Sequence, residues 1–298
     1  MLDWNTPKLS DKEWIEQCVK ESQYIGSDAA FANIYLLRSK YNIKVTYYKD
    51  LLIRYYEGLG NRKGYTFPLG RKDVLSALYA IEQDAKQMNR PLEFCFVTEE
   101  QKEILENTFA GRTESASDAG DYDYIYGQPE LSLLSGRTYH KKKNHVSKFK
   151  RTYEDYMFCE IGNGNLDDVM IIEDEWYYDR LQQDDTSSMK EYEAIREAVD
   201  NFEELSLSGG IIYANNVPVA MTIASYINDA VVDIHFEKAV GEYAVNGGFA
   251  AINQMYASTL KDVKFINREE DINIPGLRKA KESYHPKFML KKYGVRVK

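Results

Sequence analysis

The spacing of apolar residues predicts a regular series of strands and helices in the first half of the chain. Apolar and polar residues alternate in short runs, as in strands, and then recur every three to four positions, as in a helix. Proline at 91 cannot continue the first of these helices and ends it. The predicted elements are strands at 42–48, 51–56 and 65–67, a helix at 74–88, a strand at 91–98 and a helix at 99–109.

The second half of the chain repeats this order. Asn215-Asn216-Val217 separates two alternating runs and is typical of a hairpin turn. The predicted elements are strands at 208–214, 218–226 and 231–239, a helix at 247–260, a strand at 263–269, a helix at 275–284 and a final strand at 287–297. Because both halves have the order βββ-α-β-α, the sequence predicts two similar α/β units.

The segment 110–135 joins the two halves. Its Gly/Ser/Asp-rich start predicts a surface turn and a domain boundary near residue 118, so the predicted units are 1–118 and 119–298. Helices at 138–152, 165–182 and 188–204, with a loop at 184–188, are predicted before the strands of the second unit.

Charge is distributed unevenly along the 298 residues, whose formal net charge is -9. Residues 137–151 contain seven basic residues and no acidic one, whereas 154–204 contain seventeen acidic and three basic residues. The net charge argues against a protein that coats nucleic acid without specificity, and the distribution predicts a basic patch on an acidic body. Solvated helix surfaces are the alternative for these lysines.

Several protein classes are excluded by simple counts. No run approaches the ~18 apolar residues of a membrane span, and the first residues show no secretory signal, so we expect the protein in the cytosol. Three cysteines lie far apart, which excludes a disulfide framework and a local zinc cluster. The four histidines show no metal-ligand spacing, and no metal site is predicted.

Two stretches resemble a known bacterial family. The first is DYDYIYGQPELSLLSGRTYHKKKNHVSKF (121–149), and the second, at 234–286, contains VGEYAVNGGF and LRKAKESYHP. They are similar to a family whose domain is related to the C-terminal domain of phosphatidylglycerol lysyltransferase. The resemblance implies an α/β (mixed α+β) fold of two tandem GNAT-like units with mixed sheets, as in the Fem-type aminoacyltransferases.

The GNAT resemblance implies a cleft between the strands 231–239 and 263–269, which diverge in that fold. Glu237 and Lys238 end the first strand, and Asn267, Arg268 and Glu269 end the second. Lys238, Asn267 and Arg268 are the predicted cofactor contacts at these strand ends. Glu237 or Glu269 is the predicted base that deprotonates an amine, and Arg268 is predicted to hold a phosphate or carboxylate in a bidentate manner. Structural ion pairs, Glu237–Arg268 or Lys238–Glu269, fit the same residues.

Two further motifs carry predicted site residues. Gly247 and Gly248 begin a helix and would let backbone N–H groups approach a cofactor phosphate; a plain turn is the alternative. AKESYHP has the AxxxY spacing of the GNAT helix whose tyrosine protonates the leaving group, which makes Tyr284 a candidate acid or a structural tyrosine. Arg278, in the same helix, is a predicted cofactor contact.

The basic helix is the candidate surface for a polyanion. Lys141 and Lys148 share a helix face with His145. The residues predicted to contact the phosphates of a tRNA acceptor stem or of CoA are Lys141, Lys142, Lys143, Asn144 and Lys148.

The leading hypothesis is a soluble acyltransferase that moves an aminoacyl group from aminoacyl-tRNA to an amine or hydroxyl acceptor. The alternatives are a CoA-dependent N-acyltransferase of a small amine and a non-catalytic ligand-binding protein. No cofactor is predicted beyond aminoacyl-tRNA or acyl-CoA as donor, and peripheral membrane contact stays open. We expect the site in the second unit and a scaffold role for the first, because the strand ends 67–69 and 96–98 of the first unit lack a matching polar set.

Overall fold

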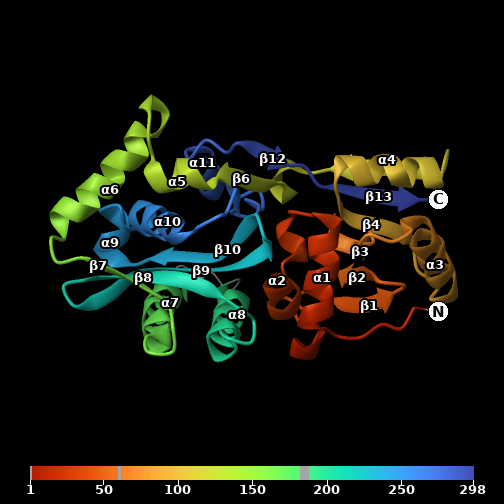
Figure 1. Cartoon of the computed structure of the whole chain (residues 1–298), viewed down its shortest axis with the longest axis horizontal. Coiled ribbons are helices and arrows are strands. Elements are labelled where there is room, and N and C mark those ends of the chain that lie inside the picture. The colour runs from red at the N-terminus through yellow and green to blue at the C-terminus, as the bar shows by residue number, and fades with distance from the viewer. Residues whose placement is uncertain (1, 60–61, 182–187) are drawn as a thin grey trace. The chain divides into compact units, whose positions relative to one another are not determined.

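The computed structural model describes residues 2–59, 62–181 and 188–298, and the chain forms two compact units (Figure 1). The first unit comprises the residues up to Tyr124 together with 269–279 and 288–298, and the second comprises 125–268 and 280–287. The predicted boundary near residue 118 lies shortly before the first change of unit. The prediction did not include the return of the C-terminal segments to the first unit.

The first unit is built on a mixed sheet of six strands. Its order is β1-β2-β3-β4-β13-β5, with β3 and β4 parallel and the other neighbours antiparallel. The C-terminal strand β13 therefore lies between β4 and β5. The strands are β1 (Lys44–Tyr48), β2 (Leu51–Glu57), β3 (Lys63–Thr66), β4 (Leu92–Val97), β13 (Tyr293–Val297) and β5 (Thr113–Ser117).

The helices of the first unit bury both faces of β2. Leu51, Ile53 and Tyr55 belong to the same core cluster as Leu78 and Ile81 of α3, because alternate residues of a strand point to one face. The helices are α1 (Lys12–Ser22), α2 (Phe31–Leu36), α3 (Val74–Gln87) and α4 (Glu99–Thr108), with short 3₁₀ turns η1 (Leu9–Asp11) and η2 (Ser27–Ala29).

The second sheet has seven strands in the order β12-β6-β11-β10-β9-β8-β7. The pair β10 and β11 is parallel, whereas β9 is antiparallel to both β8 and β10. The strands are β6 (Asp123–Gly127), β7 (Met157–Glu160), β8 (Ser208–Ala214), β9 (Val217–Asn228), β10 (Val231–Ala239), β11 (Phe265–Asn267) and β12 (Phe288–Leu290).

Helices cover the two faces of this sheet (Figure 1). Helix α10 packs on β8, β9 and β10, and both α5 and α6 pack on α10; α7 lies on the other face with α8 beside it. The helices of this unit are α5 (Gln128–Leu133), α6 (His140–Thr152), α7 (Leu166–Leu181), α8 (Ser188–Asp200), α9 (Gly241–Val245) and α10 (Gly248–Thr259). Helix α11 (Pro275–Glu282) begins in the first unit and ends in the second.

The predicted fold class is confirmed, because both sheets are mixed. Each unit also has a βββ-α-β series in which the strands before and after the helix are parallel neighbours. These pairs are β3 with β4 and β10 with β11. Residue 182, the last of the predicted helix at 165–182, lies outside the described residues. The predicted loop at 184–188 also lies outside them, apart from Ser188.

Several regions differ from the prediction. The expected surface turn within 110–135 contains β5, β6 and α5. The single strand expected at 287–297 is divided into β12 and β13, and α1, α2, β7 and α9 were not predicted. Most residues of β5 are exposed, so this strand is held by backbone pairing with β13 and leaves no hydrophobic period in the sequence.

No helix in the described part of the chain combines the length and the apolar character that a bilayer crossing requires.

A buried ionic network joins the segments of the first unit. Lys292 Nζ lies 2.7 Å from Asp123 Oδ1 and 3.1 Å from Asp28 Oδ1. Arg54 Nη2 lies 3.0 Å from the other oxygen of Asp28, and the backbone N–H of Ser27 donates to Asp123 over 2.8 Å. Burial alone would raise the pKa of Asp28, but Lys292 and Arg54 hold it below its ordinary value. The network ties the C-terminal segment to η2, β2 and β6.

Replacing Lys292 tests this connection. We expect Lys292→Met to destabilise the protein by about 3–5 kcal/mol, because it leaves two buried carboxylates without their shared cation. Lys291→Met is the matched control, since Lys291 is exposed. Urea unfolding followed by circular dichroism measures both. Equal unfolding midpoints for the two variants would contradict a stabilising role of the network.

Candidate functional site

The divergence of two parallel strands creates the opening at which the predicted residues of the second unit meet. Strands β10 and β11 pair only from Val231 to Asp233 on one side and from Phe265 to Asn267 on the other. Strand β10 continues to Ala239, whereas β11 ends at Asn267. Side chains that follow the point of divergence therefore face each other across a gap between the strands.

A buried ion pair spans this gap. Arg268 Nη2, just after β11, lies 2.7 Å from Glu237 Oε1 on β10. The second oxygen of Glu237 accepts a hydrogen bond of 3.0 Å from Asn253 Nδ2 on α10. Both charged side chains are only 11% exposed. The Glu237–Arg268 pair, which the sequence left open as an alternative, is thus present.

Two polar atoms of this group have no hydrogen-bond partner within the described residues. They are Arg268 Nη1 and Asn253 Oδ1, and both are buried. Buried polar groups are normally satisfied, so such atoms require an explanation, of which a ligand is one. A guanidinium N–H can donate to a carbonyl, carboxylate or phosphate oxygen.

Tyr284 and Lys142 complete the cluster. The Tyr284 side chain is buried, and its ring centroid lies 4.7 Å from Arg268 Cζ and 3.8 Å from Lys142 Nζ of α6. Burial raises the pKa of the Tyr284 phenol, which therefore stays protonated at neutral pH. Burial and the neighbouring Arg268 lower the pKa of Lys142 to about 8, against the opposing effect of Glu237.

The cluster therefore contains groups suited to proton transfer. A lysine with a pKa near 8 is neutral in part of the molecules at physiological pH and can accept a proton. The Tyr284 phenol can donate one, and Arg268 can bind an anionic or carbonyl oxygen. These are the roles that an acyl transfer to an amine requires.

The basic helix divides into an inner and an outer side. Lys142 shares its side with the buried Val146 and Phe149, whereas Lys141 and Lys143 are exposed. Asn144 is exposed and lies 3.4 Å from the ring nitrogen Nδ1 of His140, and Lys148 Nζ donates to the carbonyl of Val245 over 3.4 Å. The structure therefore separates Lys142 from the other residues predicted to contact phosphate.

Gly247 and Gly248 lie in a closely packed turn at the start of α10. Gly247 has φ 104°, and a Cβ there would stand 2.4 Å from the carbonyl oxygen of His145 on α6. A Cβ on Gly248 would stand 2.8 Å from the carbonyl oxygen of Tyr243. These contacts account for both glycines by packing, and the predicted phosphate contact stays a prediction.

Lys238 points to the opposite face of the sheet from Glu237, as successive residues of a strand do. It forms an ion pair with Glu191 of α8, and its Nζ lies 4.5 Å from the ring of Trp176 on α7. Burial raises the pKa of the nearby Glu173 to about 7, although Lys238 opposes that rise. Lys238 is therefore not part of the Glu237 cluster.

The remaining predicted residues occupy other positions. Asn267 is buried within β11. Glu269 and Arg278 belong to the first unit, where Asn33 donates to Glu269 over 2.8 Å and Arg278 binds Asp271 through two hydrogen bonds of 2.7 and 2.9 Å. Arg278 is thus engaged by a carboxylate of its own unit.

The sequence reasoning missed Asn253 as a site residue. It is a buried polar residue that directly follows the apolar GFAAI run of α10. A polar residue at a core position of an amphipathic helix was the signal that could have found it.

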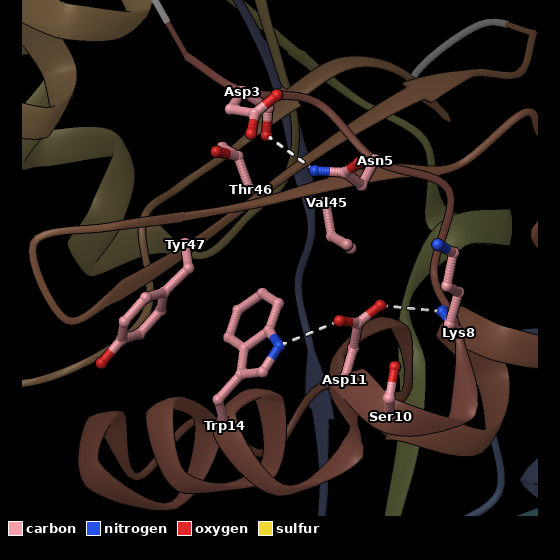
Figure 2. A pocket seen from close by; sticks show the side chains of 9 residues that line it. All are labelled: Asp3, Asn5, Lys8, Ser10, Asp11, Trp14, Val45, Thr46 and Tyr47. Carbon is pink, nitrogen blue, oxygen red and sulfur yellow. Dashed lines mark hydrogen bonds between the residues drawn. The ribbon is translucent and has the colours of Figure 1, made fainter.

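One surface cavity of the first unit, of about 350 Å³, lies between the N-terminal segment and β1 (Figure 2). Figure 2 shows Asp11 between Lys8 and Trp14, and its carboxylate accepts hydrogen bonds from the Lys8 backbone at 2.8 Å and the Trp14 indole at 3.2 Å. Because this carboxylate is already bound by its neighbours, it is a local structural group rather than a ligand site.

The family model described as phosphatidylglycerol lysyltransferase, C-terminal, matches residues 20–296. A comparison with curated proteins found no match. Among solved structures, the chain is similar to a conserved protein of unknown function from Bacteroides thetaiotaomicron VPI-5482. The two share 30% identity with a TM-score of 0.94, and the match covers 100% of both chains.

Two more distant structures share the fold. The structure of L-PGS from Bacillus licheniformis has 14% identity and a TM-score of 0.67, with 96% of this chain and 92% of that chain covered. The C-terminal domain of a putative lysylphosphatidylglycerol synthetase from Agrobacterium fabrum has 12% identity and a TM-score of 0.66, with 97% and 92% covered.

The ionisation of Lys142 provides a direct test of the cluster. We expect its amine to titrate near pH 8 in amine-labelling experiments followed by mass spectrometry, well below the ~10.4 of an ordinary lysine. Arg268→Gln should raise this pKa by removing a neighbouring positive charge, and Glu237→Gln should lower it by removing a negative one. Exposed Lys143 is the internal reference. Identical labelling profiles for Lys142 and Lys143 would contradict the burial of Lys142.

Proposed function

Since the chain belongs to the family described as phosphatidylglycerol lysyltransferase, C-terminal, we propose that it transfers an aminoacyl group from aminoacyl-tRNA to an amine or hydroxyl acceptor. The family and the GNAT-like fold are those of acyl-transferring enzymes. The observation that carries the proposal is the cluster of Glu237, Arg268, Tyr284 and Lys142 at the divergence of β10 and β11.

The proposed reaction is the aminolysis or alcoholysis of the ester that joins an amino acid to a tRNA ribose. The nucleophile of the acceptor forms a bond to the carbonyl carbon, and the bond from that carbon to the ribose oxygen breaks. Neutral Lys142 takes the proton of the nucleophile, and Arg268 Nη1 donates a hydrogen bond to the carbonyl oxygen as negative charge develops.

The leaving ribose oxygen needs a proton, because an alkoxide is a poor leaving group. Tyr284 supplies it, and protonated Lys142, whose Nζ lies 3.8 Å from the Tyr284 ring, is the nearby source that returns a proton to the phenol. Glu237 holds Arg268 in place and balances its charge. In this mechanism Glu237 acts through Arg268 rather than as the base predicted from the sequence.

The packing at the start of α10 supports an aminoacyl-tRNA donor over acyl-CoA. A GNAT fold holds the CoA phosphates at this helix N-terminus. Here the carbonyl of His145 lies against Gly247 at that place. The exposed Lys141 and Lys143 on α6 are available for a larger polyanion.

Transfer from charged tRNA tests the chemistry. With total tRNA carrying labelled amino acids and millimolar amine acceptors, we expect acceptor-dependent loss of label from tRNA. Lys142→Met should lower kcat by about 10²–10⁴, the usual contribution of a general base. Lys261→Met, at an exposed lysine outside α6, is the matched control and should retain the wild-type kcat. Consumption of acetyl-CoA with tRNA left charged would select the CoA-dependent alternative, and inactivity with both donors would support the non-catalytic one.

Salt dependence tests whether the outer side of α6 binds tRNA. Each phosphate contact contributes ~0.7–0.9 to the slope of log affinity against log salt, so Lys141→Glu with Lys143→Glu should reduce the slope by about 1.4–1.8. Lys261→Glu with Lys279→Glu makes the same charge change at other exposed lysines and should leave the slope nearly unchanged. Equal slopes for the two double variants would contradict a tRNA surface on α6.

A further inference from the structure

The first unit contains a cavity of about 550 Å³ at the ends of its own parallel strand pair. Strands β3 and β4 pair only through Tyr65 with Phe94 and Thr66 with Cys95 before they diverge. The cavity is lined by residues that follow β3, by the first turns of α4 and by residues just before β13. Its volume lies in the range of small-molecule sites.

Much of the lining of this cavity is apolar. Phe67, Pro68 and Leu69 follow β3, Ile104 projects from α4, and Leu290 precedes β13. Residues 67–69 of this set, together with 96–98, were the reason to expect no polar site in the first unit. The apolar lining suits a hydrocarbon or aromatic group, whose transfer from water is favourable by ~0.8 kcal/mol per methylene.

Charged groups gather at the α4 end of the cavity. Glu99 and Glu100 occupy the first turn of α4, and Lys291 lies at the same end. Hydrogen bonds from Lys102 and Tyr293, with Lys291 as a further positive neighbour, hold the pKa of Glu99 below its ordinary value. Glu99 is thus already matched by cations.

Glu100 has no ion pair or hydrogen bond of its side chain among the described residues. Its carboxylate is exposed at the edge of an apolar cavity. A ligand that fills the cavity and carries an ammonium group would match both features. An anionic ligand would meet the carboxylate of Glu100, which is unpaired among the described residues, whereas Lys102 and Lys291 are already balanced in part by Glu99.

We propose that the first unit binds a primary amine with an apolar body, seated between the ends of β3 and β4, with its ammonium group at Glu100. This site is independent of the chemistry proposed for the second unit. It gives the first unit a binding role in place of the scaffold role expected from its sequence.

A matched series of ligands tests the proposal by isothermal titration calorimetry on the full chain. From butylamine to octylamine we expect the Kd to fall about fourfold per methylene until the cavity is filled. Octylamine should bind more tightly than octanol, and octanol more tightly than octanoate. Octanoate binding more tightly than octylamine, or octanol binding equally well, would overturn the assignment of an amine.

Two pairs of variants locate the binding. Glu100→Gln should weaken octylamine binding by about two- to fivefold, as for an exposed ion pair, and leave octanol unchanged. Glu103→Gln, on the same helix but outside the cavity lining, should change neither.

Filling the cavity provides the second pair. Ile104→Trp should weaken all three ligands at least tenfold, whereas Leu75→Trp, which adds the same side chain at an exposed position outside the lining, should not. Thermal unfolding verifies that both tryptophan variants are folded. Wild-type affinity in folded Ile104→Trp would place the binding elsewhere and overturn the proposal, whatever the outcome of the transfer assay.

Discussion

The shortness of one parallel ladder in each sheet determines where each unit can bind a ligand. Three residue pairs join β10 to β11, and two join β3 to β4. Beyond these pairs the strands separate, and side chains must fill the space that a longer ladder would close. In the second unit this space holds charged and polar groups, and in the first it is a mainly apolar cavity. The same backbone geometry thus supports two different kinds of site.

Two of the buried ionic groups among the described residues lie in different surroundings. Lys292 in the first unit has carboxylate partners at 2.7 and 3.1 Å and a hydroxyl at 3.2 Å. In the second unit Arg268 Nη1 and Asn253 Oδ1 have no partner within the described residues. The Lys292 network also contains a buried atom without a partner among the described residues, Arg54 Nε. An unsatisfied atom alone therefore does not identify a ligand site. The second-unit group differs because it lies where β10 and β11 diverge and because its Arg268 packs on the ring of Tyr284.

The fold was largely predictable from the sequence because its central strands and helices have clear periods. Strand β5 was not, since most of its residues are exposed and its pairing partner β13 is distant in sequence. The inward orientation of Lys142 could have been predicted from the sequence. Val146 and Phe149, four and seven residues later, are apolar and mark the inner side of α6. The opposite directions of Glu237 and Lys238 also follow from strand alternation. The partnership of Arg278 with Asp271 depends on a tertiary arrangement that no local pattern encodes.

The charge balance of the second-unit cluster connects its structure with its proposed chemistry. Two cationic side chains, Arg268 and Lys142, lie against one tyrosine ring, and Glu237 is the carboxylate whose field reaches both. Burial acts to lower the pKa of Arg268, but Glu237 and the neighbouring tyrosines together raise it by more. Arg268 therefore keeps its positive charge. The excess positive charge is therefore relieved at Lys142, which loses a proton near pH 8 or retains it when an anionic oxygen binds beside it. Neutral Lys142 can accept a proton, and protonated Lys142 can bind an anion. In the proposed reaction, negative charge develops on the carbonyl oxygen. That charge favours protonated Lys142 at the step in which Lys142 accepts the proton of the nucleophile.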